Sequence, residues 1–364
     1  MRMVIQRIMC NFASKTKTII KEERNTTMKK EDLRIVFMGT PEFAVETLKR
    51  LVEGGYNVVG VVTQPDKPVG RHGSVLRDPA VKEYALQKGL PVLQPEKMKD
   101  PQFVEALDAW NADLQVVVAF RMLPEVVWAM PSFGTFNVHA ALLPRYRGAA
   151  PINWAIINGE KKTGVTTFFL DHDIDTGRII KQKEFDIPDD ADVEYVYNGL
   201  MTLGAELALE TVDAIIENDG DIASIPQDDF ISTTDESALP HAPKIFKETC
   251  EIDWNNTAKN IYNFVRGLSP IPAAWTTLYK KGEEKGDGIV LKIYKTAKTG
   301  LPVISEKSEA AHTPGAISIE KGRLMIAAYD EWLEIVELQI AGKKRMMARD
   351  FLNGFHNLDH FFAE

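Results

Sequence analysis

The sequence has few cysteines and no long apolar run, and both absences exclude whole classes of protein. Cys10 and Cys250 are the two cysteines among 364 residues, too few for a disulfide framework or a zinc site. The longest apolar runs are short blocks such as residues 58–62 and 116–120, whereas a membrane-spanning helix needs roughly 20 residues. The content of 45% hydrophobic and 26% charged residues is that of a globular protein. We therefore expect a cytoplasmic protein without a membrane partner.

Positive charge is missing from one long stretch of the chain. Residues 184–239 carry sixteen acidic residues and neither lysine nor arginine, and the rest of the chain has 43 bases against 36 acids. The net charge of −9 therefore does not exclude a nucleic acid partner, because electrostatic attraction acts within about one Debye length. Only the acidic face is excluded as a docking surface for a polyanion.

The chain divides into four parts by composition and pattern. Residues 1–32 are basic and lack a periodic apolar face, so we expect a disordered leader, or an artefact of the choice of start site with Met28 as the natural start. Residues 33–218 alternate short apolar runs with helical stretches, which predicts a Rossmann-like, doubly wound α/β sheet of mostly parallel strands. Residues 219–240 are polar and aperiodic, which indicates a linker. Residues 241–364 contain short alternating runs with Gly and Pro turns, which predict a smaller C-terminal β-barrel, OB-like in form.

Within the α/β part the pattern places individual elements. Thr40 is expected to cap a helix whose first position is Pro41, and a long amphipathic helix is expected over residues 192–217. The expected strands cover residues 33–38, 58–63, 91–93, 113–119 and 135–139, followed by a pair of strands at 164–170 and 177–185.

Candidate site residues lie at the carboxyl ends of the expected strands, where open α/β sheets bind ligands. The turn at residues 39–41 lacks the three-glycine fingerprint of dinucleotide sites, which argues against a nicotinamide cofactor. Asn137 and His139 are two residues apart on a strand, so their side chains project from the same face. A polar pair there is unfavourable unless it is hydrogen-bonded. The two residues either satisfy loop backbone or take part in chemistry.

Two further segments follow this strand. Arg145 and Arg147 precede a helix expected at residues 149–158, an arrangement that suits an anionic ligand. The turn that begins at Asp175 separates two apolar runs and needs no function of its own. His172 has no spaced partner for a metal ion, so we expect no metal site.

Several motifs in this order resemble the methionyl-tRNA formyltransferase family, within the folate-dependent formyltransferase superfamily. They are RIVFMGTPEFA, GVVTQPDKPVGR, NVHAALLPRYRGAAPINWAI and DIDTG, and the distal EIDW and LQIAGKKRMMARDFLNG match the family as well. The match spans residue 33 to about residue 354. The resemblance implies transfer of the formyl group of 10-formyltetrahydrofolate, a co-substrate, to the α-amino group of methionine on initiator Met-tRNA. It also implies that Asn137, His139 and Asp175 are the catalytic residues and that the folate-binding loop is Ala141, Leu142, Leu143 and Pro144.

The chemistry of formyl transfer agrees with the residue types in this set. Attack of an amine on a formyl carbon creates an oxyanion, which hydrogen-bond donors stabilise. We expect Asn137 and His139 to supply these donors and Asp175 to orient His139 and relay a proton, without a covalent enzyme intermediate. Two segments depart from the family pattern: Ala140-Ala141 stands where Gly-Ser is usual, and VVVAFRMLP replaces AYGxILP near Phe120 and Arg121.

Basic residues supply the affinity for a polyanion, because they neutralise phosphates. We expect a monomer that binds tRNA through three basic groups. The predicted tRNA-binding residues are Arg71, Arg145, Arg147, Lys343, Lys344 and Arg345.

Other activities remain open at this point. The same three catalytic residues would serve a formyltransferase acting on an amino-sugar nucleotide or on glycinamide ribonucleotide, or a hydrolase that releases formate from the folate. A catalytically silent tRNA-binding module is a further alternative. The C-terminal part of about 120 residues favours the tRNA enzyme, and the intact Asn–His–Asp set argues against a silent module.

Overall fold

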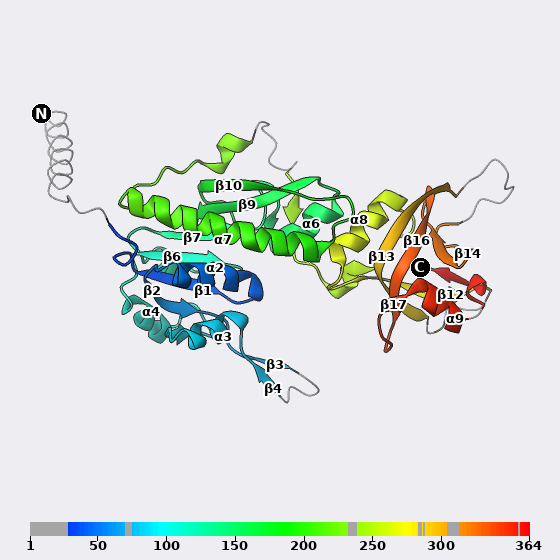
Figure 1. The fold of residues 1–364 in the computed structure, drawn as a ribbon, viewed down its shortest axis with the longest axis horizontal. Coiled ribbons are helices and arrows are strands. Elements are labelled where there is room, and N and C mark those ends of the chain that lie inside the picture. The colour runs from blue at the N-terminus through cyan, green and yellow to red at the C-terminus, as the bar shows by residue number, and fades with distance from the viewer. Residues whose placement is uncertain are drawn as a thin grey trace, which may run out of the picture.

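Residues 28–69, 75–231, 239–282, 286, 288–303, 313–355 and 357–364 are described by the computed structural model of the chain. Figure 1 shows an elongated molecule in which an N-terminal part and a C-terminal part, each built on one large sheet, follow one another along the long axis. Arg71 and residues 1–27 lie outside the described residues, so the expectations for them stay predictions. Met28 packs against the core of the N-terminal part, and the Lys30 ammonium donates a hydrogen bond of 3.0 Å to the Tyr56 hydroxyl.

The N-terminal part is built on a seven-stranded sheet. Five strands run parallel in the order β5, β2, β1, β6, β7, and β9 and β10 continue the sheet antiparallel beyond β7. This arrangement confirms the expected mostly parallel sheet. The bounds are β1 Ile35–Gly39, β2 Val58–Val62, β5 Val92–Leu93, β6 Leu114–Val118, β7 Thr135–His139, β9 Lys162–Phe169 and β10 Ile179–Asp186.

Helices cover both faces of this sheet, which explains why its central strands are apolar throughout. All five residues of β1 and of β6 are buried, as expected for parallel strands covered on both sides. Asp192 caps the longest helix by accepting a hydrogen bond of 3.0 Å from the backbone N–H of Tyr195. One face carries α2 (Glu42–Glu53), α3 (Ala80–Gln87) and α7 (Val193–Glu217), and the other carries α4 (Pro101–Asp108) and α5 (Glu125–Trp128).

The start of α2 differs from the expectation. The helix begins at Glu42, and Pro41 occupies the cap position in an extended conformation, with φ −79° and ψ 173°. Thr40 therefore lies one residue too early to cap the helix. Its hydroxyl is buried and has no hydrogen-bond partner in the described part of the chain.

The C-terminal part is a small antiparallel barrel with the strand order β14, β15, β16, β13, β12, β18. A bridge between Ala316 and Phe362 closes the sheet, and the N–H of Ala363 donates to the Gly315 carbonyl over 2.9 Å. The expected β-barrel is confirmed. Its elements are α8 (Ala258–Leu268), β12 (Ala274–Lys280), β13 (Ile289–Pro302), β14 (Ile317–Glu320), β15 (Arg323–Ala327), β16 (Glu331–Ile340), β17 (Met346–Met347), α9 (Ala348–Gly354) and β18 (Phe361–Ala363).

The segment expected to be a linker, residues 219–240, has described residues that pack against the N-terminal part. Ile225 exchanges two backbone hydrogen bonds of 2.8 Å with Ile179 of β10. A one-turn helix, η2 (Gln227–Phe230), follows. Just beyond the segment, β11 (His241–Ala242) pairs in parallel with β8 (Arg147–Gly148). Local sequence shows no period here because these contacts join residues far apart in the chain.

The two parts meet at a polar interface around α8. Arg266 is 7% exposed, and its guanidinium donates to the carbonyls of Ala191 and Pro188 over 2.9 and 3.3 Å. The side chain of Asn153 in α6 (Pro151–Ile157) donates to the Gly267 carbonyl over 2.8 Å. None of the helices among the described residues combines the length and apolar character that crossing a bilayer requires.

Candidate active site

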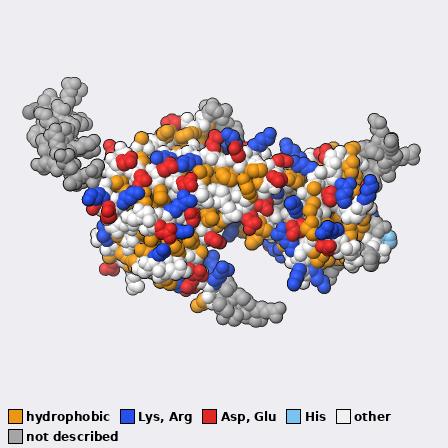
Figure 2. Space-filling view, viewed as in Figure 1, with side chains coloured by type: hydrophobic (Ala, Val, Ile, Leu, Met, Phe, Trp, Pro, Cys, Tyr) orange, Lys and Arg blue, Asp and Glu red, His pale blue; other side chains and the backbone are white. Residues whose placement is uncertain are grey.

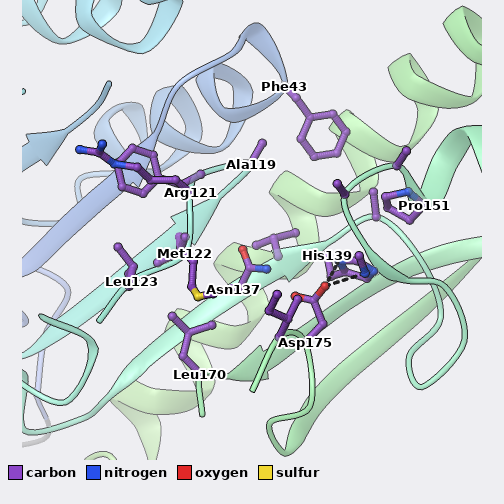
Figure 3. A pocket seen from close by; sticks show the side chains of 18 of the residues that line it. Phe43, Ala119, Arg121, Met122, Leu123, Asn137, His139, Pro151, Leu170 and Asp175 are labelled. Carbon is purple, nitrogen blue, oxygen red and sulfur yellow. Dashed lines mark hydrogen bonds and ion pairs between the residues drawn. The ribbon is translucent and has the colours of Figure 1, made fainter. Parts of the chain in front are cut away.

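A cavity of about 660 Å³ opens at the carboxyl ends of β1, β6 and β7. This is the edge at which parallel α/β sheets bind ligands. Figure 3 shows Asn137, His139 and Asp175 between two apolar regions of the wall. The apolar residues are Phe43, Pro151, Val193 and Tyr197 in one region and Met122, Leu123, Trp128 and Leu170 in the other (Figure 3).

The strand β7 supplies two of the polar side chains. Asn137 and His139 both line the cavity, as expected from their spacing of two residues. The side chain of His139 is 6% exposed, whereas Asn137 is half-buried. No hydrogen bond joins the Asn137 amide to another residue that the structure describes, so its donors and its acceptor face the cavity (Figure 3).

The orientation of His139 is set by a backbone carbonyl. Its Nε2 lies 2.9 Å from the carbonyl oxygen of Tyr146. A carbonyl only accepts, so Nε2 carries the hydrogen and donates it, and in the neutral ring Nδ1 is the acceptor. Nδ1 lies 3.8 Å from Oδ2 of Asp175. This distance is too long for a hydrogen bond but short enough for a strong charge interaction once the ring is protonated.

Asp175 is held through its carboxylate by the backbone of Gly148. Its carboxylate, 14% exposed, accepts a hydrogen bond of 2.9 Å from the backbone N–H of Gly148. Its backbone has φ 57°, a left-handed conformation that non-glycine residues seldom adopt. Gly148 has φ 126°, and a Cβ at this position would lie 2.5 Å from the Ala242 carbonyl oxygen. Only glycine fits there, so the glycine of the RGAAP segment brings the N–H close to Asp175.

Tyr146 connects the His139 contact to its surroundings. The residue is buried with φ 61°, and its N–H donates to the Pro240 carbonyl over 2.6 Å. Its hydroxyl donates to Glu160 over 2.7 Å. Burial, with a smaller contribution from Glu160, raises the pKa of Tyr146 to about 12, so the phenol stays neutral. No sequence pattern singled out Tyr146, because its role depends on its backbone carbonyl.

The expected folate-binding loop lies behind the cavity wall. Ala140 lines the cavity, but none of the four loop residues that follow it does. The loop is fastened to β9 and β10: the Thr166 hydroxyl donates to the Ala141 carbonyl over 2.7 Å, and the Gln182 amide donates to the Leu143 carbonyl over 2.8 Å. Leu143 packs in a small apolar cluster with Phe168 and Ile179.

The segment that departs from the family pattern does line the cavity. Phe120, Arg121 and Met122 all contribute to its wall. The Arg121 guanidinium donates to the backbone carbonyls of Pro95 and of Glu96, the latter over 2.9 Å. Burial lowers the pKa of Arg121.

The basic residues expected to contact tRNA have different surroundings. Arg145 forms an ion pair with Glu160, and Arg147 donates to the side-chain oxygen of Gln227 over 3.0 and 2.8 Å. Both arginines thus contact protein groups, and neither lines the cavity. Arg71, which was also expected to contact tRNA, lies outside the described residues.

The barrel residues lie on the hairpin between β16 and β17. Arg345 forms two hydrogen bonds of 2.5 and 2.6 Å with Glu337 and stacks 4.3 Å from the centroid of the Tyr294 ring. Lys343 and Lys344 are exposed at the turn, and their ammonium groups have no ion-pair partner among the described residues. Figure 2 shows Lys and Arg side chains gathered on this side of the C-terminal part, next to a notch between the two parts.

The described residues contain no group of three or more His, Cys, Asp or Glu side chains that could hold a metal ion. His172 contacts the Trp128 ring and lies 3.9 Å from Glu125.

Comparison with known proteins gives consistent matches over both parts. A family model described as formyl transferase matches residues 33–212, and a model for the formyl transferase C-terminal domain matches residues 244–356. The methionyl-tRNA formyltransferase of Parabacteroides distasonis is 59% identical over 337 residues, 92% of this chain and 99% of the relative. That of Bacteroides fragilis is 55% identical over 337 residues, 92% of this chain and 98% of the relative.

Solved structures with low sequence identity share the fold. An N-formyltransferase from Helicobacter canadensis, in complex with folinic acid and dTDP-3-aminofucose, has a TM-score of 0.57 at 19% identity, covering 86% of this chain and 100% of that one. HypX from Aquifex aeolicus in complex with tetrahydrofolic acid has a TM-score of 0.55 at 19% identity, covering 91% of this chain. The match covers 48% of HypX, so the chain spans about half of its length.

Proposed function

Because the chain belongs to the methionyl-tRNA formyltransferase family, we propose that it transfers the formyl group of 10-formyltetrahydrofolate to the α-amino group of methionine on initiator Met-tRNA. The observation that carries the proposal is the meeting of Asn137, His139 and Asp175 in one cavity, in a chain that has both family domains. We also propose the division into a catalytic domain at 33–218, a connecting segment at 219–240 and a tRNA-binding barrel at 241–364. The protein would act as a monomer in the cytoplasm.

The cavity fits a folate of this kind. A pterin ring is planar and largely apolar on its faces, and the wall that includes Met122, Leu123 and Trp128 offers apolar surface for it. The opposite region, with Phe43 and Tyr197, would take the apolar side chain of methionine. The reacting groups would then meet between the two regions, beside the three polar residues.

The folate supplies an activated formyl group, and the chain supplies donors and a proton acceptor. As the amine nitrogen bonds to the formyl carbon, negative charge develops on the formyl oxygen, and the Asn137 amide donates to it. An α-amino group ordinarily has a pKa of about 8, so about a tenth of it is already neutral at pH 7 and a strong base is unnecessary. The expectation that His139 also donates to the oxyanion is less well supported, because its Nε2–H is already bonded to the Tyr146 carbonyl.

We therefore assign His139 to proton transfer at Nδ1. The neutral ring accepts the proton that the amine loses, and the Asp175 carboxylate, 3.8 Å away, stabilises the resulting imidazolium. The same proton then passes to the folate nitrogen as its bond to the formyl carbon breaks. Atoms and charge balance, and the side chain returns to its starting state.

The tRNA is proposed to lie in the notch between the two parts. Lys343 and Lys344 are exposed at the turn between β16 and β17, and their ammonium groups have no ion-pair partner among the described residues, which suits contacts to phosphates. The raised pKa of Arg345, caused mainly by its hydrogen bonds to Glu337, and the stacking on Tyr294 suggest that this residue chiefly holds the hairpin. Arg71 remains a candidate for contact with the acceptor stem.

Formylation measured on several acceptors tests the proposal. Initiator Met-tRNA, uncharged initiator tRNA, free methionine and an amino-sugar nucleotide are each incubated with the protein and 10-formyltetrahydrofolate. We expect a formyl product with Met-tRNA alone. Release of formate without any acceptor would support the hydrolase, and formylation of the sugar nucleotide would support the other transferase; either result without formyl-Met-tRNA refutes the proposal.

A further inference from the structure

A buried glutamine in the segment between the two parts contacts the catalytic turn. Gln227, at the start of η2, is 3% exposed. Its Nε2 donates to the carbonyls of Asp175 and Gly177, both over 2.8 Å. Its Oε1 accepts from Nε and Nη2 of Arg147 over 3.0 and 2.8 Å. Both amide hydrogens and both lone pairs of this side chain are therefore used.

These four hydrogen bonds join the turn that carries Asp175 to the segment whose backbone N–H binds the Asp175 carboxylate. Nε2 holds the backbone of the turn, where Asp175 has φ 57°, a conformation that persists only when the surroundings hold it. Oε1 holds Arg147, the neighbour of Gly148, whose N–H donates to the carboxylate. One side chain thus fixes Asp175 and its hydrogen-bond donor relative to each other.

The rest of the segment is docked without Gln227. Two backbone hydrogen bonds of 2.8 Å join Ile225 to Ile179, and Nε of Arg178 donates to the Ser224 hydroxyl over 2.9 Å. An apolar side chain of similar size at position 227 would fill the space without the desolvation of an amide. The polar side chain is thus explained by the directions of its hydrogen bonds rather than by packing.

We propose that Gln227 is a positioning residue that sets the distance between the Asp175 carboxylate and the His139 ring. The effect on turnover rests on the proposed function, because it assumes that Asp175 assists proton transfer at His139. The effect on the turn itself does not depend on the reaction. The segment predicted to be a linker then helps to position a catalytic residue, Asp175.

The substitution Gln227→Met tests the proposal, with Ser224→Ala as the matched control. Gln227→Met keeps the volume and removes all four hydrogen bonds, so kcat for formylation of Met-tRNA is expected to fall about 10- to 100-fold, the range for a small misplacement of a reacting group. The KM values for both substrates should stay within about threefold, since neither substrate contacts this side chain. Ser224→Ala removes one hydrogen bond from the same segment and should leave kcat unchanged.

Hydrogen exchange supplies a readout that needs no activity. The Gly148 amide should lose protection in Gln227→Met, because its acceptor on Asp175 is no longer held, and should keep it in Ser224→Ala. A second variant, Gln227→Glu, keeps the acceptor for Arg147 but replaces the NH₂ group with an oxygen that cannot donate to the carbonyls of Asp175 and Gly177. We expect the same loss of kcat and of Gly148 protection.

The outcomes separate the two proposals. If the parent protein does not formylate Met-tRNA, the proposed function fails, and exchange at Gly148 still decides the role of Gln227. If the parent is active and the Gln227 variants keep its kcat, or if Gly148 stays protected in them, the positioning role is refuted. A rise in KM with unchanged kcat would refute it as well.

Discussion

Replacing Asp175 with asparagine removes the negative charge of the side chain and keeps its size and shape. The Asn side chain has nearly the same volume, and its amide oxygen can still accept the hydrogen bond from the Gly148 N–H. The negative charge 3.8 Å from Nδ1 of His139 is lost. The fold should therefore survive, while the protonated state of His139 loses its stabilising partner.

The expected size of the effect follows from the distance. At 3.8 Å, two unit charges attract by about 4 kcal/mol at an effective dielectric constant of about 20 and by about 1 kcal/mol in bulk water. The two side chains are only 6% and 14% exposed, so the larger value is the better guide. A loss of about 4 kcal/mol in the transition state corresponds to about 10³-fold in rate. We expect kcat to fall about 10²- to 10³-fold.

The assay is steady-state formylation of initiator Met-tRNA with both substrates saturating, together with the melting temperature of each protein. Asp186→Asn, at the exposed end of β10, removes a charge away from the cavity and serves as the control. A kcat for Asp175→Asn close to that of the parent, with equal melting temperatures, would refute the charge interaction as a part of catalysis.

Three further predictions concern other parts of the chain. Asn137→Ala should lower turnover about 10²- to 10³-fold, the range for losing one oxyanion donor. His139→Ala should lower it by about as much, because a positioned group that transfers a proton is lost, and neither substitution should change the melting temperature much. Replacing Lys343 and Lys344 with glutamine should weaken tRNA binding and reduce the log–log salt dependence by about one unit per lost phosphate contact, as a salt titration would show; an unchanged slope would remove this turn from the tRNA site. A chain that begins at Met28 should equal the full-length protein in melting temperature and in turnover, because the residues before it have no periodic apolar face to bury; a clear loss of either would show that they bind or pack.

The sequence predicted the elements whose pattern is local. The long helix was expected over residues 192–217, and the structure has it from Val193 with Asp192 as its cap. The strand with Asn137 and His139 was predicted residue for residue, because its apolar and polar positions alternate as the pleat requires. The sequence alone therefore identified the strand that carries two of the three proposed catalytic residues.

The remaining parts of the site depend on contacts between distant residues. Gln227 lies in a stretch without a period, and its partner Asp175 is 52 residues away along the chain. Tyr146 acts through its backbone carbonyl, so its side chain gave no signal. Pairing of β11 with β8 joins His241 to Arg147, and a two-residue strand is too short to show alternation. Such features emerge only once the chain is folded.

The buried Arg266 also bears on how the molecule unfolds. Its guanidinium is buried, and the carbonyls of Pro188 and Ala191 in the N-terminal part accept the hydrogen bonds that water would otherwise accept. If the N-terminal part unfolded alone, Arg266 would lose these acceptors. The surface of α8 that packs against α6 would become exposed to water at the same time. Each part therefore owes some of its stability to the other, and the two should melt together in a single cooperative transition. A destabilising substitution in the barrel would then also lower the temperature at which the cavity around His139 is lost.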